Sequence, residues 1–128
     1  MGIFDGLIIF EMANSHQGSV EHGRSIIREM AKIARKYNIK AAVKLQYRNL
    51  DTFIHPDYKG RTDVKHISRF ESTKLTYEQF CVLVSAIKEE GLIAMSTPFD
   101  EDGVEWCQSQ GLDIIKIASC SAMDWPLL

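Results

Sequence analysis

Residues 41–47 have the sequence Ala-Ala-Val-Lys-Leu-Gln-Tyr, a short apolar run that also carries Lys44 and Gln46. A short apolar run of this kind is typical of a buried strand. Lys44 and Gln46 are two residues apart and therefore lie on one face of such a strand. The chain contains three further runs of this type, at residues 7–12, 92–97 and 113–118.

Helical patterns separate these apolar runs. They lie at residues 19–37, 76–91 and 100–111, and a fourth begins at 124. Ser19 is a suitable N-cap for the first, and Thr76 with Gln79 forms a capping-box pattern at the start of the second. Pro126 lies in the first turn of the fourth, where proline is tolerated. The alternation predicts parallel βαβ units and an α/β fold.

Residues 48–75 break this alternation with a polar, weakly periodic insertion after the second predicted strand. The pairs His55-Pro56 and Lys59-Gly60 are turn signals, and we expect a loop that is functional or mobile. A closed (β/α)8 barrel needs eight strands and roughly 250 residues. With about four βα units, residues 1–128 are either a small open α/β domain or the N-terminal half of one TIM-type barrel domain.

Composition excludes several classes of protein. Of the 128 residues, 45% are hydrophobic and 25% are charged, which is typical of a soluble globular protein. The net charge is -2 and Lys and Arg are scattered, so we expect no nucleic-acid binding. No apolar run is long enough to span a membrane. Three cysteines without metal-like spacing indicate reduced thiols, and we expect a cytoplasmic protein.

Polar side chains gather at the carboxyl ends of the four predicted strands, where ligands bind in α/β folds. Two strand lysines, Lys44 and Lys116, together with hydroxyl groups, suit an anion such as a phosphate or carboxylate. A strand lysine can also carry its charge out of the apolar layer without a chemical role, and Glu11 can pair structurally with one of them. The candidate residues are Glu11, Lys44, Gln46, Ser96, Thr97, Phe99, Lys116 and Ser119.

The four histidines, His16, His22, His55 and His66, do not form a metal motif. His16 follows the first predicted strand, where a histidine that only forms hydrogen bonds is the commoner case. No glycine-rich phosphate loop is present. We therefore assign no metal ligand to this chain.

Four segments together resemble the N-acetylneuraminate (sialic acid) synthase family, including its spore-coat polysaccharide synthesis proteins. They are Phe-Glu-Met-Ala-Asn-Ser-His-Gln-Gly at 10–18, Val-Lys-Leu-Gln-Tyr at 43–47, Ser-Thr-Pro-Phe-Asp at 96–100 and Asp-Ile-Ile-Lys-Ile-Ala-Ser at 113–119. Their order matches the family pattern, and they cover nearly the whole chain. Cys120-Ser121 stands where the family usually has Gly-Glu, which leaves the acceptor sugar open.

The resemblance implies a condensation of phosphoenolpyruvate with an N-acetylmannosamine-type amino sugar, with release of phosphate. It also implies a divalent metal, manganese or magnesium, held by residues on later strands outside this chain, and a homodimer. By the same resemblance, Gln46 and Phe99 shape the site and Glu11 lies near the reacting carbons. The phosphate and carboxylate of phosphoenolpyruvate are expected on Lys44, Thr97, Lys116 and Ser119.

Two other classes of function remain as alternatives. A receiver-like signalling domain has a similar length and βα alternation, but it needs aspartates where this chain has Glu11 and Ser96-Thr97. The isolated 128 residues are alternatively a catalytically inactive fragment, since half a barrel exposes strand edges and apolar faces.

Overall fold

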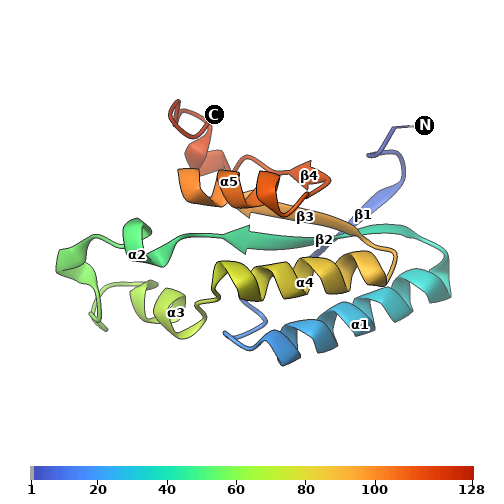
Figure 1. Ribbon diagram of the computed structural model, residues 1–128, viewed down its shortest axis with the longest axis horizontal. Coiled ribbons are helices and arrows are strands. Elements are labelled where there is room, and N and C mark those ends of the chain that lie inside the picture. The colour runs from blue at the N-terminus through green and yellow to red at the C-terminus, as the bar shows by residue number, and fades with distance from the viewer. Residues whose placement is uncertain (1) are drawn as a thin grey trace.

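The computed structural model describes residues 2–128, which form one sheet of four parallel strands in the order β1-β2-β3-β4 (Figure 1). The strands are β1 (Leu7–Glu11), β2 (Lys40–Tyr47), β3 (Ile93–Pro98) and β4 (Ile114–Ile115). Each pairs in parallel with the next strand along the chain, which confirms the α/β fold class. A receiver-like domain has the strand order 2-1-3-4-5, and the observed order contradicts that alternative.

Three helices connect the strands and begin where capping residues predict them. They are α1 (Val20–Tyr37), α4 (Tyr77–Glu89) and α5 (Glu101–Ser109). The side chains of Ser19 and Asp100 accept hydrogen bonds from backbone N–H groups in the first turns of α1 and α5. Thr76 and Gln79 form the full capping box of α4, with bonds of 3.2 Å and 2.8 Å. These contacts satisfy N–H groups that have no partner inside the helix.

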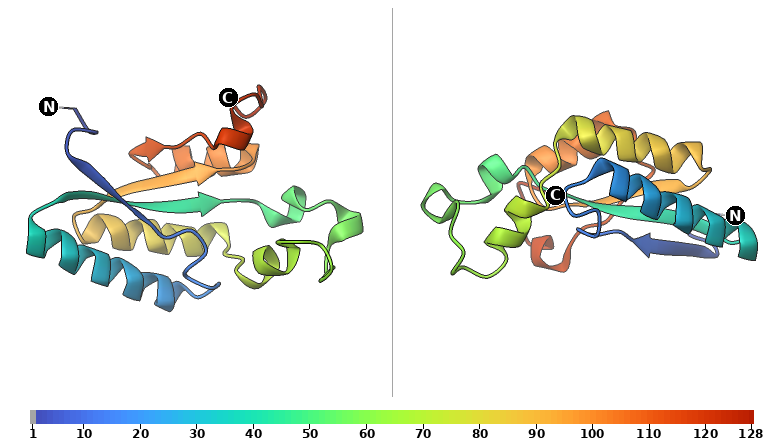
Figure 2. Two further views of the ribbon diagram at one scale, coloured as in Figure 1. Left: turned by 180° about the vertical axis from the view of Figure 1, so that it is seen from behind. Right: turned by 90° about the horizontal axis from the view of Figure 1, so that it is seen from below.

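The main hydrophobic core lies between the helices and one face of the sheet. Helices α1 and α4 lie side by side against this face (Figures 1 and 2). Gly23 of α1 permits their close approach, since a Cβ atom there would lie 2.8 Å from Cδ2 of Leu83. The β2 side chains in this core are Ala41, Val43, Leu45 and Tyr47.

The alternate residues of the strands face the opposite side of the sheet, called here the inner face. A small cluster of Ala42, Met95 and Ile114 lies there, separate from the main core. Because side chains alternate along a strand, Lys44 and Gln46 share this face with Ala42. The polar residues of β2 are thus held on the face away from the helices.

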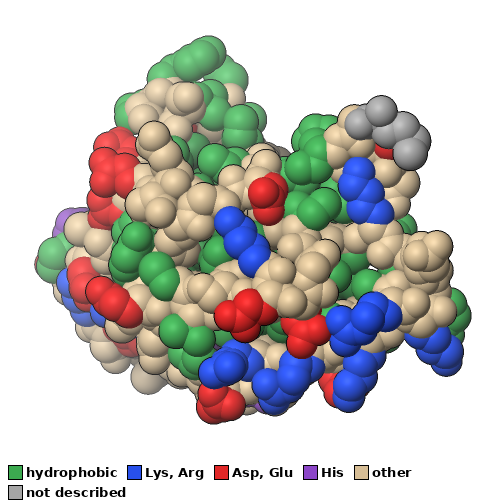
Figure 3. Space-filling model, turned by 45° about the vertical axis from the view of Figure 1, so that its right-hand side comes forward, with side chains coloured by type: hydrophobic (Ala, Val, Ile, Leu, Met, Phe, Trp, Pro, Cys, Tyr) green, Lys and Arg blue, Asp and Glu red, His purple; other side chains and the backbone are tan. Residues whose placement is uncertain are grey.

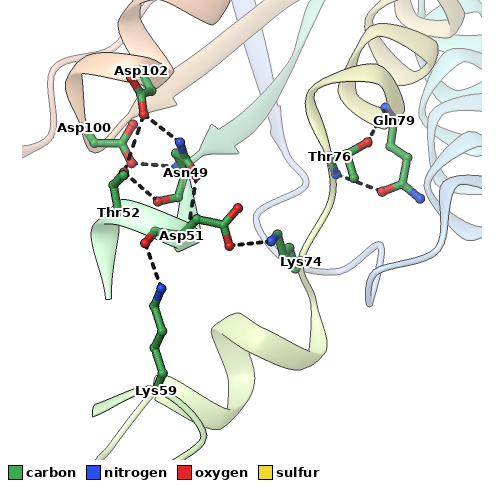
Figure 4. A network of polar contacts seen from close by, with 9 residues as sticks. All are labelled: Asn49, Asp51, Thr52, Lys59, Lys74, Thr76, Gln79, Asp100 and Asp102. Carbon is green, nitrogen blue, oxygen red and sulfur yellow. Dashed lines mark hydrogen bonds and ion pairs between the residues drawn. The ribbon is translucent and has the colours of Figure 1, made fainter. Parts of the chain in front are cut away.

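The insertion at residues 48–75 is more ordered than the expected loop. It contains α2 (Leu50–Phe53), the 3-10 helix η1 (Pro56–Tyr58) and α3 (Ile67–Ser72), and it projects beyond the carboxyl end of β2 (Figure 2). Asn49 anchors its start, because its backbone N–H and its side-chain amide donate to Asp100 and Asp102, each at 2.7 Å (Figure 4). Lys74 at its end pairs with Asp51 at 2.9 Å. The Asn49 contacts hold the start of the insertion against α5, and the Lys74–Asp51 pair joins the two ends of the insertion; periodicity reveals neither.

Two predicted elements near the C-terminus are shorter than expected. β4 covers two residues instead of 113–118, since it pairs only with β3 and has no second neighbour in the described sheet. It is followed by the 3-10 helix η2 (Ser119–Ser121). The helix predicted from residue 124 is present only as a turn, in which Asp124 O accepts from the N–H groups of Leu127 and Leu128.

Both outer strands expose hydrophobic side chains. Ile8 and Ile9 of β1 are 46% and 45% exposed, and Ile115 at β4 is 47% exposed. In Figure 3, charged side chains gather on the lower part of the molecule, whereas hydrophobic side chains are exposed in the upper part near the two ends of the chain. No helix among residues 2–128 is long and apolar enough to cross a membrane.

Candidate active site

Lys44 and Glu11 meet at the carboxyl end of the inner face. Parallel pairing of β1 with β2 sets Glu11 directly beside Lys44, and the ammonium contacts the carboxylate. The Lys44 side chain is only 7% exposed, whereas that of Glu11 is 45% exposed. Burial of an unpaired ammonium is costly, so Glu11 is the group that makes the buried position of Lys44 tolerable. An ammonium has three donors, and one contact with Glu11 leaves others for a ligand.

Thr97 lies on the same face, one step further along. The register pairs Gln46 of β2 with Thr97 of β3. The side chain of Thr97 is buried, and its Oγ1 has no hydrogen-bond partner among residues 2–128. A buried hydroxyl without a partner is rare and points to a group that the described residues do not supply.

Ser96 points the other way. Strand alternation places it on the helix side of the sheet, and its hydroxyl donates to the carbonyl of Leu45 at 3.2 Å. It is fully buried. Its hydroxyl is therefore already used within the sheet and stands apart from the group formed by Glu11, Lys44 and Thr97.

Lys116 and Ser119 lie at the exposed end of the sheet. The N–H of Lys116 donates to the carbonyl of Ser96 at 2.9 Å, which extends the pairing of β4 by one residue. Two residues after Ile114, Lys116 continues on the inner face. Both Lys116 and Ser119 are exposed, and the described residues give neither side chain a hydrogen bond or an ion pair. Ser121, where the resembled family usually has glutamate, is buried.

Arg48 is the site residue that the sequence analysis missed. Its Nη1 donates to Oε1 of Gln46 at 3.2 Å. Its guanidinium carbon lies 3.9 Å from the centre of the Phe99 ring and 4.5 Å from that of Phe70, with Phe53 at 5.6 Å. Burial lowers the pKa of Arg48, and the carboxylate of Asp100 opposes the change. The place of Arg48 on the inner face could be predicted from the sequence, because Lys44, Gln46 and Arg48 follow one another at every second residue.

A cleft of about 590 Å³ opens next to Gln46. One wall is the loop after β1, including Asn14 and Gln17, and the other is α3 of the insertion, including Arg69 and Phe70. The remaining lining residues are Ala13, Ser15, His66 and Thr73. Amides, hydroxyls, a cation and an aromatic ring together suit a small polar ligand such as a sugar. The insertion thus forms one wall of the candidate site.

His16 shapes the loop after β1. It is buried, and its Nδ1 accepts a hydrogen bond from the N–H of Gly18 at 3.1 Å. Burial, with a smaller contribution from His22, lowers the pKa of His16 to about 4. The imidazole is therefore neutral at neutral pH, and the hydrogen bond agrees with the structural role expected for it.

The described residues do not fit a metal site by themselves. Within residues 2–128 no three His, Cys, Asp or Glu side chains come together as a metal ion would require. The acidic group Glu11 is already paired with Lys44. The three cysteines, Cys81, Cys107 and Cys120, are free thiols.

Comparison with known proteins adds a family and three solved structures. The model of the NeuB family matches residues 30–128. The putative spore coat polysaccharide biosynthesis protein E of Chromobacterium violaceum is 52% identical, with a TM-score of 0.91; the match covers 95% of this chain and 36% of that one. The spore coat polysaccharide biosynthesis protein spsE of Bacillus subtilis is 28% identical, with a TM-score of 0.64 over 94% of this chain and 31% of that one.

A third structure extends the match in fold. The N-acetylneuraminic acid (sialic acid) synthetase of Leptospira borgpetersenii, solved in complex with citrate, is 21% identical, with a TM-score of 0.74 over 95% of this chain and 39% of that one. The four parallel strands with their connecting helices match the N-terminal part of the TIM barrels of these proteins, which confirms the predicted fold class. The chain spans about a third of the length of each of these relatives.

Proposed function

The chain belongs to the NeuB family, and from this membership we propose that the whole protein is a sialic acid synthase-like enzyme. It joins phosphoenolpyruvate to an amino sugar of the N-acetylmannosamine type and releases phosphate, in the biosynthesis of a surface polysaccharide. One observation carries the proposal: the buried ammonium of Lys44 shares the inner face at the carboxyl end of the sheet with the hydroxyl of Thr97, which has no hydrogen-bond partner among residues 2–128. Both are donors suited to an anionic substrate.

In this proposal each residue has a role that follows from its position. Lys44 and Thr97 hold the anionic groups of phosphoenolpyruvate, and Lys116 and Ser119 approach them from the exposed end of β4. The ammonium groups stabilise the charge that develops as phosphate departs. Glu11 keeps Lys44 oriented and lies near the reacting carbons. Ser96 holds the sheet, since its hydroxyl is bonded to a strand carbonyl.

Gln46 and Phe99 would form the side that faces the acceptor sugar. Gln46 lines the cleft, and Phe99 holds Arg48 beside it. The lining includes neutral polar groups and an aromatic ring, as hydroxyl-rich ligands require. The identity of the sugar is therefore proposed as a class, an N-acylated amino sugar in its open-chain aldehyde form.

We also propose a divalent metal ion, manganese or magnesium, bound by residues outside those described. Such an ion would polarise the sugar aldehyde. The homodimer and the inactivity of the isolated 128 residues stay predictions, checked by light scattering and by assay of the fragment alone. A cytoplasmic location is supported by the free thiols.

The test uses the full-length protein with manganese. Phosphate release from phosphoenolpyruvate should require an amino-sugar aldehyde, and Lys116→Ala should remove most of the activity. Lys36→Ala, on the last turn of α1, is the matched control and should retain it. Phosphate release that is equally fast without the sugar, or normal turnover of Lys116→Ala, would contradict the proposal.

A further inference from the structure

We propose that Arg48 is a positioning residue that fixes the carboxamide of Gln46 with its N–H donors toward the cleft, where they bind an oxygen atom of the acceptor sugar. This inference rests on the proposed function, since it assigns the ligand of the cleft as the acceptor. It also assigns a function to the insertion, because two of the rings that contact Arg48, those of Phe53 and Phe70, belong to the insertion.

The orientation of Gln46 follows from the chemistry of its partner. A guanidinium has five N–H donors and no acceptor. The contact of 3.2 Å between Arg48 Nη1 and the Gln46 side chain therefore requires the amide oxygen of Gln46. The NH2 group must then face away from Arg48. Since Gln46 lines the cleft, its two free donors are available to a ligand there.

Three aromatic rings, Phe53, Phe70 and Phe99, hold the guanidinium, and we call them the aromatic clamp. Phe53 lies in α2 and Phe70 in α3, whereas Phe99 directly follows β3. A cation–π contact is stronger when the cation is desolvated, and the guanidinium of Arg48 is partly buried among these rings. Arg48 therefore links the insertion to the end of the sheet through Gln46.

Phe70 belongs to both the clamp and the cleft wall. Movement of α3 would therefore alter the width of the cleft and the support of Arg48 together. None of the nine lining residues is an aspartate or glutamate, so an oxygen of the ligand meets no carboxylate among them. A hydroxyl or acyl carbonyl oxygen is the group that fits Gln46 in this orientation.

Gln46→Glu is the sharpest test in the full-length protein. Glutamate keeps the size and the contact with Arg48, yet it offers the cleft an oxygen instead of N–H donors. We expect the KM for the amino sugar to rise about tenfold or more, because the carboxylate of the glutamate repels the sugar oxygen to which the Gln46 amide would donate a hydrogen bond. The new carboxylate also lies beside Thr97 and repels phosphoenolpyruvate, so the KM for the sugar should rise by more than the KM for phosphoenolpyruvate. An unchanged KM for the sugar would overturn the assignment.

Arg48→Met tests the positioning itself. Methionine fills the aromatic clamp but cannot donate to Gln46, so the KM for the sugar should rise while that for phosphoenolpyruvate does not. Arg61→Met is the matched control, because Arg61 also lies in the insertion against a ring, that of Tyr58, and pairs with Asp63. A role limited to stability would leave both KM values unchanged in Arg48→Met, and that result would overturn the inference.

Hydrogen–deuterium exchange separates this inference from the proposed function. Arg48→Met should increase amide exchange in residues 67–73, whereas Arg61→Met should not. If the wild-type protein shows no synthase activity, the proposed function fails, and the exchange result still decides whether Arg48 holds α3. Exchange that is unchanged in Arg48→Met would overturn the positioning role.

Discussion

Replacement of Thr97 by valine should make the protein more stable and less active. The Thr97 side chain is 2% exposed and its hydroxyl has no partner within residues 2–128. A buried hydroxyl without a hydrogen bond costs about 1–3 kcal/mol in proteins. Valine keeps the branched shape that suits a strand and removes this cost. We therefore expect Thr97→Val to raise the free energy of unfolding by about 1–2 kcal/mol.

Thermal unfolding of the full-length protein without substrates measures the first effect. A gain of this size should raise Tm by roughly 1–4 °C for a protein larger than a small domain. Phosphate release over a series of phosphoenolpyruvate concentrations measures the second, and the KM for phosphoenolpyruvate should increase. Stability and activity should thus change in opposite directions.

Thr97→Ser is the control variant. It keeps the hydroxyl and loses one buried methyl group, so it should be less stable by about 1 kcal/mol and retain binding of phosphoenolpyruvate. A Thr97→Val protein with a lower Tm than wild type and a normal KM would refute the reasoning. The hydroxyl would then have a partner in the sheet and no role toward the substrate.

Three further variants test other contacts. Glu11→Ala should cost about 2 kcal/mol of stability, and more than Lys44→Met, because it leaves a buried ammonium unpaired; equal losses in denaturant unfolding would contradict this. The pKa of His16 is lowered to about 4, so its contribution to stability is complete above about pH 6.5 and is lost as the pH falls toward 4. Unfolding free energies from pH 4 to 7.5 should therefore show a loss of about 3 kcal/mol at low pH that His16→Gln lacks. Gly23→Ala should lower stability by up to about 2 kcal/mol in the same unfolding assay, because crowding of its Cβ, 2.8 Å from the end of the Leu83 side chain, outweighs the gain of about 1 kcal/mol in helix propensity; a raised Tm would show that Leu83 makes room for the methyl group.

The main elements of the fold were predictable because they depend on local chemistry. Ser19, Thr76 and Asp100 cap their helices through hydrogen bonds to residues three positions away, and such signals are visible in any short window. The short length of β4 was not predictable, because it depends on the absence of a second neighbouring strand in the described sheet. The periodicity of hydrophobic residues does not show which strand lies at the edge of the sheet.

The candidate site was predictable only in part. The sequence suggested that Glu11 could pair with one of the two strand lysines. The parallel register of β1 with β2 decides that this lysine is Lys44. Arg48 continues the alternation of Lys44 and Gln46, but its contacts with Phe70 and Phe99 join segments more than 20 residues apart in sequence. Contacts that join distant segments are set by tertiary packing, and no local pattern reveals them.

The alternation along β2 has a consequence for the evolution of the protein. One set of its residues packs against the helices and the other carries Lys44 and Gln46. Loss or gain of one residue within 40–48 would exchange the two sets and place a lysine in the hydrophobic core. Length changes should therefore be rejected in this strand and accepted in the exposed stretch around η1. Changes of substrate are then expected to arise by substitution at residues 44, 46 and 48 and by changes in loop length beyond them.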